Sequence, residues 1–526
     1  MTASVLESGR VSLGIELGST RIKACLVDTV TAKVIGVGSH EWENQLVDGL
    51  WTYSLDEVWR GLQGSFADLQ LNLEKQYGAK VSKLESLAIS AMMHGYLAFD
   101  RSGELLIPFR TWRNTNTGDA AKELSELFDF NIPLRWSIAH LHQVVIEKHP
   151  HIQHIDFVTT LAGYVHWKLS GEKVLGIGDA SGMFPIDSVA SSYDQEMVEL
   201  YDQKASEYGF GKQLLSLLPR VRVAGEQAGL LSEAGAKLLD PSGLLQAGSL
   251  MAPPEGDAGT GMVATNAIAP RTGNVSAGTS IFAMVVMERP LSKMHEEVDI
   301  VTTPVGDQVA MVHCNNGASE LAAWASMFVR FSEAAGIKLS TDQVYEVLFT
   351  EALSGEADAG GILAYNYLAG EPIAGIGEGR PLFLRTPGSE FSLGNAFRAQ
   401  LYGVFGTLSL GMRVLQEEGV QLDQMAAHGG IFRTKGVAQR FLAAALNAEV
   451  TVSSEASEGG AWGAAVLAAF TSSSHKDLSS FLNEVVFAGA SVVSQAPIPE
   501  DVAGYQKYLV AYERGLAVEA KATEVI

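Results

Sequence analysis

The sequence has very few cysteines: Cys25 and Cys314 are the only two in 526 residues. Two thiols so far apart in the chain supply neither a disulfide framework nor the paired cysteines of a zinc or iron–sulfur site. This scarcity argues against a cysteine-stapled secreted domain. It indicates a protein of a reducing compartment, so we expect a cytoplasmic location.

Positive charge is also scarce. The 37 Lys and Arg residues stand against 60 Asp and Glu residues, the net charge is -23 at pH 7, and no block of basic residues interrupts the acidic background. A strongly negative protein repels nucleic acids and anionic membrane surfaces. We therefore expect no nucleic-acid partner and no membrane partner.

Long hydrophobic runs are missing as well. The apolar run at residues 461–470 is far shorter than the ~20 residues that span a bilayer, and residues 1–10 lack the charged-then-apolar layout of a signal peptide. The composition, 47% hydrophobic and 18% charged, is otherwise that of a globular protein with large cores. A chain of this length predicts two to four domains.

Two stretches of the sequence share one layout. Residues 11–28 and 272–287 each read as an apolar strand, a short turn of glycine and hydroxyl residues, and a second apolar strand. The match predicts an internal duplication into two similar α/β domains, with a boundary near residues 266–272. We assign 11–268 to an N-terminal domain, 269–472 to a C-terminal domain and 473–526 to a helical extension.

Hydrophobic periodicity predicts the other main elements of this α/β fold. Strands are expected at residues 34–42, 84–90, 309–314, 425–428 and 449–452, and helices at 56–77, 258–266, from 319 onward, and at 395–418, 436–447, 459–470 and 505–516.

The two repeated turns are candidates for phosphate binding. Gly18-Ser19-Thr20 and Gly278-Thr279-Ser280 each direct backbone N–H groups and hydroxyls to one point, which suits a phosphate. Glu16, just before the first turn, has the carboxylate that Mg²⁺ prefers. One such turn alone also fits an ordinary hairpin. Two such turns, one at the start of each similar domain, favour a single ATP whose phosphates contact one turn from each domain.

Asp257 lies in a glycine-rich bend, PPEGDAGTG, at the start of an expected helix. Phosphoryl transfer to an alcohol uses a carboxylate that accepts the proton of the attacking hydroxyl. A helix-capping role is the structural alternative. Asp257 is our candidate for the catalytic base.

Three further segments are candidates for ligand contacts. Met93-His94-Gly95 follows an apolar strand, at the position where α/β sheets bind ligands, although a single histidine is often an ordinary interior residue. Trp112-Arg113 offers a stacking face and hydrogen bonds, or forms a surface turn. Gly429-Gly430, between an expected strand and helix, lets a flat base lie on the backbone.

These pieces, in this order, resemble the FGGY family of carbohydrate kinases over residues 11–472. The stretch 164–181, YVHWKLSGEKVLGIGDAS, also resembles a passage of that family that is mostly structural. The resemblance implies an actin-like (ribonuclease H-like) fold, with two duplicated α/β domains flanking a cleft for ATP and substrate. It implies ATP-dependent phosphorylation of a hydroxyl of a small sugar or polyol, with ATP and Mg²⁺ as cofactors.

The resemblance also implies a role for each matching residue. Asp257 matches the catalytic base, which also contacts the substrate, and Glu16 matches the metal ligand. The other matching residues fall into two sets, which are the substrate-binding residues Met93, His94, Trp112 and Arg113, and the ATP- and phosphate-binding residues Gly18, Ser19, Thr20, Lys23, Gly278, Thr279, Ser280, Gly429 and Gly430.

Three features depart from the family pattern. Glu16 replaces the usual Asp, residues 136–150 lack the usual Lys and Trp, and Tyr402 stands where Glu is common. They indicate a divergent branch. The Met93-His94-Gly95 match favours a ketopentose such as xylulose, while a polyol or an aldonate (glycerol, a tetritol, gluconate) is the alternative substrate. Analogy with the family adds a homodimer as an expectation.

Two other functions remain for the same fold. A non-catalytic ATP-binding switch or filament protein of the actin kind would not need the Asp257 bend or the Met93-His94-Gly95 segment. A dehydratase-activating ATPase would need cluster-binding cysteines, which Cys25 and Cys314 do not provide.

Overall fold

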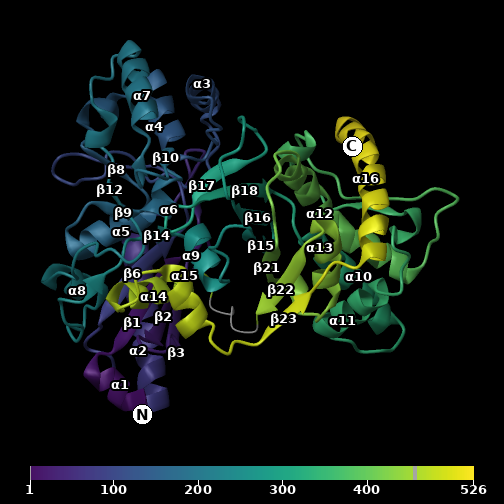
Figure 1. The fold of residues 1–526 in the computed structure, drawn as a ribbon, viewed down its shortest axis with the longest axis horizontal. Coiled ribbons are helices and arrows are strands. Elements are labelled where there is room, and N and C mark those ends of the chain that lie inside the picture. The colour runs from purple at the N-terminus through teal and green to yellow at the C-terminus, as the bar shows by residue number, and fades with distance from the viewer. Residues whose placement is uncertain (1, 454–458) are drawn as a thin grey trace. The chain divides into compact units, whose positions relative to one another are not determined.

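The computed structural model describes residues 2–453 and 459–526, which fall into two compact units. The first unit comprises residues up to 268 together with 300–309 and 459–489. The second comprises 269–299, 310–453 and 490–526. Figure 1 labels the elements of both.

The first unit is an α/β unit with one main sheet and several short ribbons. Its strands are β1 (Val11–Leu17), β2 (Arg21–Asp28), β3 (Val34–Glu41), β4 (Gln45–Val47), β5 (Leu50–Thr52), β6 (Ser86–Ala91), β7 (Leu97–Phe99), β8 (Phe157–Thr159), β9 (Val174–Gly176), β10 (Ile186–Asp187), β11 (Ser192–Tyr193), β12 (Arg220–Arg222), β13 (Leu250–Met251) and β14 (Glu255–Gly256). Its helices are α1 (Thr2–Ser8), α2 (Leu55–Tyr77), α3 (Gly118–Phe128), α4 (Ser137–Ile146), η1 (Pro150–His154), α5 (Leu161–Ser170), α6 (Ile177–Ala180), α7 (Gln195–Glu207), η2 (Leu214–Ser216), α8 (Glu233–Leu239), α9 (Asp257–Ala264), α14 (Gly459–Ser472), α15 (Leu478–Phe481) and η7 (Leu482–Val486).

The second unit has the same class of architecture. Its strands are β15 (Thr272–Ala277), β16 (Ile281–Val286), β18 (Gln308–Cys314), β19 (Leu363–Tyr365), β20 (Leu382–Leu384), β21 (Gln424–Gly429), β22 (Glu449–Ser453) and β23 (Val492–Gln495), and β17 (Asp299–Thr302) lies where the chain passes from one unit to the other. Its helices are α10 (Glu320–Ala334), α11 (Thr341–Ala352), η3 (Ala359–Gly361), η4 (Pro372–Ala374), α12 (Leu393–Glu417), η5 (Gly430–Phe432), α13 (Val437–Leu446) and α16 (Pro499–Val525).

The two main sheets repeat one topology. In the first unit the order is β13–β6–β1–β2–β3, with β1 antiparallel to β2 and parallel to β6, and with β13 parallel to β6. In the second unit the order β22–β21–β15–β16–β18 corresponds, with β15 antiparallel to β16 and parallel to β21, and with β22 parallel to β21. The repeat confirms the predicted duplicated α/β fold.

The helix over residues 459–472 lies in a different unit from the one we expected. We placed it in the C-terminal domain, but α14 packs against β1, β2, β6 and α9 of the first unit (Figure 1). Gly14 on β1 permits the close approach, because a Cβ at Gly14 would lie 2.1 Å from the carbonyl oxygen of Ala461. The chain therefore returns to the first unit to complete its core.

The expected C-terminal extension is only partly helical. Helix α16 forms at Pro499–Val525, but residues 492–495 form strand β23, which pairs antiparallel with β22. The prediction of a helical tail is wrong at these residues. Residues 492–495 pair with β22, which lies about 40 positions earlier in the sequence, at the edge of the sheet. The local sequence pattern does not indicate such a long-range pairing.

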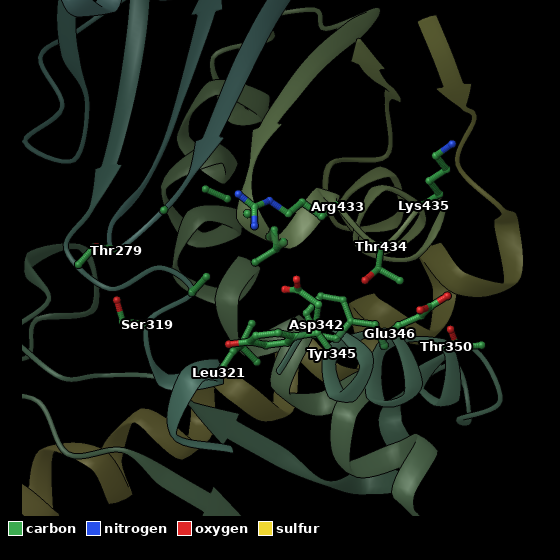
Figure 2. A pocket seen from close by; sticks show the side chains of 16 residues that line it. Thr279, Ser319, Leu321, Asp342, Tyr345, Glu346, Thr350, Arg433, Thr434 and Lys435 are labelled. Carbon is green, nitrogen blue, oxygen red and sulfur yellow. The ribbon is translucent and has the colours of Figure 1, made fainter. Parts of the chain in front are cut away.

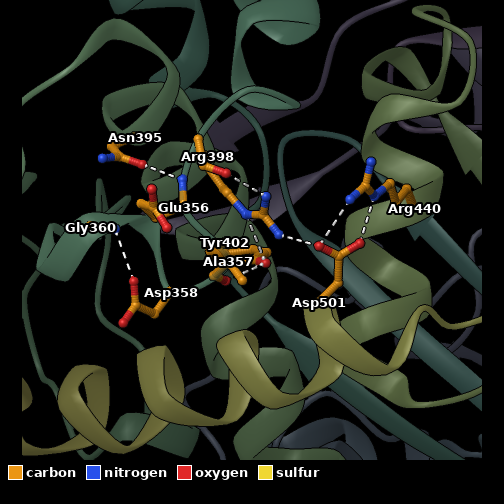
Figure 3. A network of polar contacts seen from close by, with 10 residues as sticks. Glu356, Ala357, Asp358, Gly360, Asn395, Arg398, Tyr402, Arg440 and Asp501 are labelled. Atoms are coloured by element: carbon orange, nitrogen blue, oxygen red, sulfur yellow. Dashed lines mark hydrogen bonds and ion pairs between the residues drawn. The ribbon is translucent and has the colours of Figure 1, made fainter.

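A buried ion network joins α16 to α12 and α13 within the second unit (Figure 3). Asp501, in the first turn of α16, receives Arg398 Nη2 from α12 at 2.5 Å and Arg440 Nε from α13 at 2.5 Å. Arg398 also donates to the hydroxyl of Tyr402 at 3.0 Å, and that hydroxyl donates to the carbonyl of Ala357 at 3.0 Å. Tyr402, a departure from the family pattern, thus belongs to a structural network.

None of the helices in the described part of the chain combines the length and apolar character required to cross a membrane.

Candidate active site

The first predicted phosphate turn, Gly18-Ser19-Thr20, connects β1 to β2. A stacked aromatic pair, Trp42 and Tyr53, whose ring centroids are 4.0 Å apart, supports it. The Trp42 indole N–H donates to the Gly18 carbonyl at 2.7 Å, and the Tyr53 hydroxyl donates to the Ser19 carbonyl at 2.6 Å. These bonds hold the turn in place through its carbonyl groups. Within the turn the Gly18 N–H donates to the Arg21 carbonyl at 3.1 Å and the Ser19 hydroxyl donates to Met92 Sδ at 3.4 Å, while Thr20 is exposed.

Glu16 and Lys23 face each other across this hairpin. They are directly paired in the β1–β2 register, and Lys23 Nζ lies 3.6 Å from Glu16 Oε2. Burial raises the pKa of Glu16, and the positive charge of Lys23 opposes the increase. The pair places one carboxylate and one cation beside the turn.

Asp257 is the first residue of α9. Strand β14 places it there, because Glu255 and Gly256 pair with Ser90 and Ala91 at the end of β6. Its side chain is open to solvent, yet the surrounding protein atoms, and secondarily the charge of Glu16, raise its pKa to about 6. The sheet therefore brings the candidate base to the strand end that precedes Met93.

The Met93-His94-Gly95 turn contacts Asp257 directly. The backbone N–H of Met93 donates to Asp257 Oδ1 at 3.4 Å. His94 has a φ of 67°, which is unusual for a non-glycine residue, and its Nδ1 lies 3.1 Å from the carbonyl oxygen of Gly182. The side chains of Met93 and His94 are almost fully buried. The structure thus unites residues that are about 160 positions apart in the sequence.

Trp112 and Arg113 lie in a segment of the first unit that adjoins the Met93-His94-Gly95 turn, because Arg110 pairs with Tyr96. Trp112 packs against its hydrophobic core, and the Arg113 guanidinium lies 3.9 Å from the centroid of the Trp51 ring. Within the described residues, no hydrogen bond or ion pair joins either of them to Asp257. Their contact with a substrate stays a prediction.

The second unit contains a cavity of about 780 Å³ between the second phosphate turn, α11 and the segment that follows β21 (Figure 2). Its lining residues are Ala277, Gly278, Thr279, Ala318, Ser319, Leu321, Asp342, Tyr345, Glu346, Phe349, Thr350, Gly430, Ile431, Arg433, Thr434 and Lys435. The volume lies within the usual range for small-molecule and cofactor sites.

Three of the five residues predicted for nucleotide binding in this unit line the cavity: Gly278, Thr279 and Gly430. Ser280 and Gly429 do not. Position 429 requires glycine for a structural reason, because its φ is 124° and a Cβ there would lie 2.0 Å from the Ala277 carbonyl oxygen. It lets the neighbouring strands β15 and β21 end close together.

Two parts of the cavity wall were not predicted from the sequence. One is the face of α11 that carries Asp342, Tyr345 and Glu346, which no motif marks. The other is Arg433-Thr434-Lys435, where basic and hydroxyl residues directly follow the Gly-Gly turn. This pattern of basic and hydroxyl residues after a glycine turn could have predicted a site for an anionic ligand. Arg433 and Lys435 both line the cavity, and in Figure 2 their side chains extend in different directions.

The residues near Glu16 fit a magnesium ion that is carried mainly by a nucleotide. Within the described residues, no group of three or more His, Cys, Asp or Glu side chains is arranged to hold a metal. Mg²⁺ in kinases needs only one or two carboxylates, because phosphate oxygens and water complete its shell. Glu16, whose charge contributes to the raised pKa of the nearby Asp257, supplies one such carboxylate.

The repeated sheets and the cavity of the second unit define an actin-like α/β protein with a nucleotide-sized site. Sequence models of the FGGY family of carbohydrate kinases match both halves of the chain: the N-terminal domain at residues 11–244 and the C-terminal domain at 273–472. The chain belongs to this family and is an ATP-dependent carbohydrate kinase. A search of curated protein sequences gave no match.

Solved structures show the same fold at low identity. The ligand-bound xylulose kinase from Lactobacillus acidophilus is 18% identical, with a TM-score of 0.78 over 98% of this chain and 100% of its own. Gluconate kinase from the same organism is 18% identical, with a TM-score of 0.78 over 98% and 99%. Plasmodium falciparum glycerol kinase with ADP is 14% identical, with a TM-score of 0.74 over 97% and 98%.

Proposed function

We propose that this carbohydrate kinase phosphorylates a hydroxyl of a ketopentose such as xylulose, with Asp257 as the general base. The observation that carries the proposal is the contact between Asp257 and the Met93-His94-Gly95 turn, whose sequence resembles the substrate segment of xylulokinases. A substrate held by that turn would place a hydroxyl beside the carboxylate. The likeness in fold to a xylulose kinase is consistent with this substrate class.

The chemistry follows from the charge state of Asp257. With a pKa of about 6, its carboxylate is ionised at neutral pH and is more basic than an ordinary aspartate. The hydroxyl proton moves to a carboxylate oxygen of Asp257 while the hydroxyl oxygen bonds to the γ-phosphorus. The bond from that phosphorus to the β–γ bridging oxygen breaks, and ADP leaves.

Other residues of the chain would hold the phosphates and the base of ATP. The N–H and hydroxyl groups of both glycine turns suit phosphate oxygens, and the cavity of the second unit suits the adenosine part. Glu16 would hold Mg²⁺, which neutralises charge on the transferring phosphoryl group. Cytoplasmic location and a homodimer stay predictions, supported by the scarcity of cysteine and by analogy respectively.

The test is ADP release from ATP with Mg²⁺, measured against a panel of ketopentoses, polyols and aldonates. Stimulation by a ketopentose supports the proposal. Stimulation by glycerol or gluconate alone would replace the substrate class but keep the kinase. Nucleotide-driven filaments, without stimulation by any sugar, would favour the switch protein.

The role of Asp257 is tested by Asp257→Asn at saturating sugar and ATP. General-base catalysis contributes about 10²–10⁴-fold, so kcat should fall by at least that much. Asp156→Asn is the matched control, because Asp156 lies in the same unit and only faces Lys173 at 3.8 Å on the surface. Near-normal turnover of Asp257→Asn would show that another group accepts the proton.

A further inference from the structure

A second carboxylate, Glu255, is buried directly behind Asp257. Its side chain is 1% exposed and accepts the backbone N–H groups of Gly178 at 3.3 Å and Asp179 at 2.9 Å. A Cβ at Gly178 would lie 2.4 Å from Glu255 Oε2, so glycine is what permits this approach. Glu255 thus connects the short helix α6 to strand β14, which directly precedes Asp257.

A third carboxylate, Asp179, lies beside the first two. It is fully buried, and its Oδ2 accepts the Thr160 hydroxyl at 2.6 Å. Its Oδ1 has no hydrogen-bond partner within the described residues. That oxygen lies 3.2 Å from the position of a Cβ on Gly256, the residue that precedes Asp257. The family passage that includes Asp179 was expected to be mostly structural, yet it reaches the active site.

No cation compensates these two buried carboxyl groups. Within the described residues, neither Asp179 nor Glu255 forms an ion pair. The titratable groups that face them are Asp257 from α9 and Tyr193 from β11, whose pKa is raised by burial and by the charge of Asp179. Lys23 is paired with Glu16.

Two neighbouring carboxylates buried without a cation do not both ionise at neutral pH, because each charge pays a desolvation cost and repels the other. We propose that Asp179 and Glu255 retain one proton between them and act as positioning residues, which leave Asp257 as the charged carboxylate on the substrate side. The inference rests on the proposed role of Asp257 as the base.

The ionisation properties agree with this geometry. Burial, followed by the charge of Asp179, raises the pKa of Glu255 to about 8, and burial, followed by the charge of Asp257, raises the pKa of Asp179 to about 7. When the pair loses its retained proton at higher pH, a second full charge appears next to Asp257, and the repulsion between these buried carboxylates acts against the fixed position of the base. Turnover should then fall.

The first experiment needs no substrate and follows thermal unfolding of the full chain from pH 5 to pH 9. A carboxyl group with a raised folded pKa stabilises fully below its unfolded pKa, and that stabilisation is lost as pH rises through the folded pKa. The neutral isosteres Asp179→Asn and Glu255→Gln do not titrate. Their Tm, relative to wild type, should therefore increase steadily up to about pH 8.

A structural role alone would give an offset in Tm that does not change with pH, and that result would overturn the inference. Asp202→Asn is the matched control: its carboxylate accepts the Leu214 N–H at 2.8 Å in another part of the same unit. Asp202 has a pKa that is only modestly raised by burial, so its Tm difference should level off at lower pH.

The second experiment measures kcat against pH with the sugar that the panel identifies. Wild-type turnover should decline above about pH 8, and the decline should shrink in Asp179→Asn and Glu255→Gln. Identical profiles would refute the positioning role. The two proposals fail separately: a fully active Asp257→Asn contradicts the proposed base, whereas a pH-independent Tm offset contradicts the retained proton and leaves the base untouched.

Discussion

Asp501 is the residue whose removal should damage the second unit most. Its carboxylate and the Arg398 side chain are each only 2% exposed, and it receives hydrogen bonds from both Arg398 and Arg440. Burial tends to raise the pKa of Asp501, but the two guanidinium groups outweigh it and lower the pKa. Its stabilisation is therefore present above an ordinary aspartate pKa and is lost as pH falls through the lowered value.

The expected loss follows from what Asp501→Ala leaves behind. Arg398 keeps its bonds to Gly355 and Tyr402, but its buried charge loses its counter-ion. Breaking one side of a buried ion pair costs about 3–5 kcal/mol. For a unit of roughly 200 residues, each kcal/mol shifts Tm by about 2–4 °C, so the second unit should melt about 6–20 °C lower.

Differential scanning calorimetry at pH 7 is the assay, because it resolves the two units if they melt apart. Glu513→Ala is the matched control: it breaks the exposed Arg413–Glu513 pair, also on α16, and should cost less than about 1 kcal/mol. Adding Arg398→Met to Asp501→Ala should recover part of the stability, because no unpaired charge remains. If Asp501→Ala melts like Glu513→Ala, the network is not a source of stability and the reasoning fails.

Three further predictions concern activity. If Asp257 is the general base, as proposed, it must be ionised to act; with a pKa of about 6, kcat/KM should then fall about tenfold per pH unit below that value, and a flat profile down to pH 5 would contradict this assignment. Arg433→Ala should raise the KM for ATP about tenfold or more, since a charged hydrogen bond is worth about 1.5–3 kcal/mol. Arg385→Ala, which removes an exposed guanidinium of the same unit that does not line the cavity, should do much less, and equal effects would remove Arg433 from the nucleotide site. Gly429→Ala should lower Tm and ATP affinity together, because its Cβ would collide with Ala277; unchanged thermal and ATP titrations would show that the strands can separate there.

Much of the candidate site could be predicted from local sequence. The glycine turns after β1 and β15 and the bend before α9 are short-range features, since backbone conformation at glycine and turn residues is set within a few positions. The family resemblance to FGGY kinases, the duplicated fold and the kinase class are confirmed. The roles of the individual residues stay predictions until variants are assayed.

Other parts of the site had no local signal. The α11 wall of the cavity carries Asp342 and Glu346, which look like ordinary solvent-facing residues of an amphipathic helix. The pair of buried carboxyl groups beside Asp257 also could not be predicted from local sequence. Asp179 and Glu255 are separated by 76 positions, and the Asp179 backbone N–H donates to the Glu255 carboxylate only in the folded protein.

The sequence alone predicted the two hairpins that open the two halves and the place of Asp257, the candidate base, in a glycine-rich bend before a helix. Each depends on periodicity or turn chemistry within a few residues. Only the tertiary structure decided which unit α14 completes, where β23 pairs, and that the buried Asp179 and Glu255 lie beside Asp257. Those outcomes depend on burial and on long-range backbone pairing, whose energies arise only when distant segments meet.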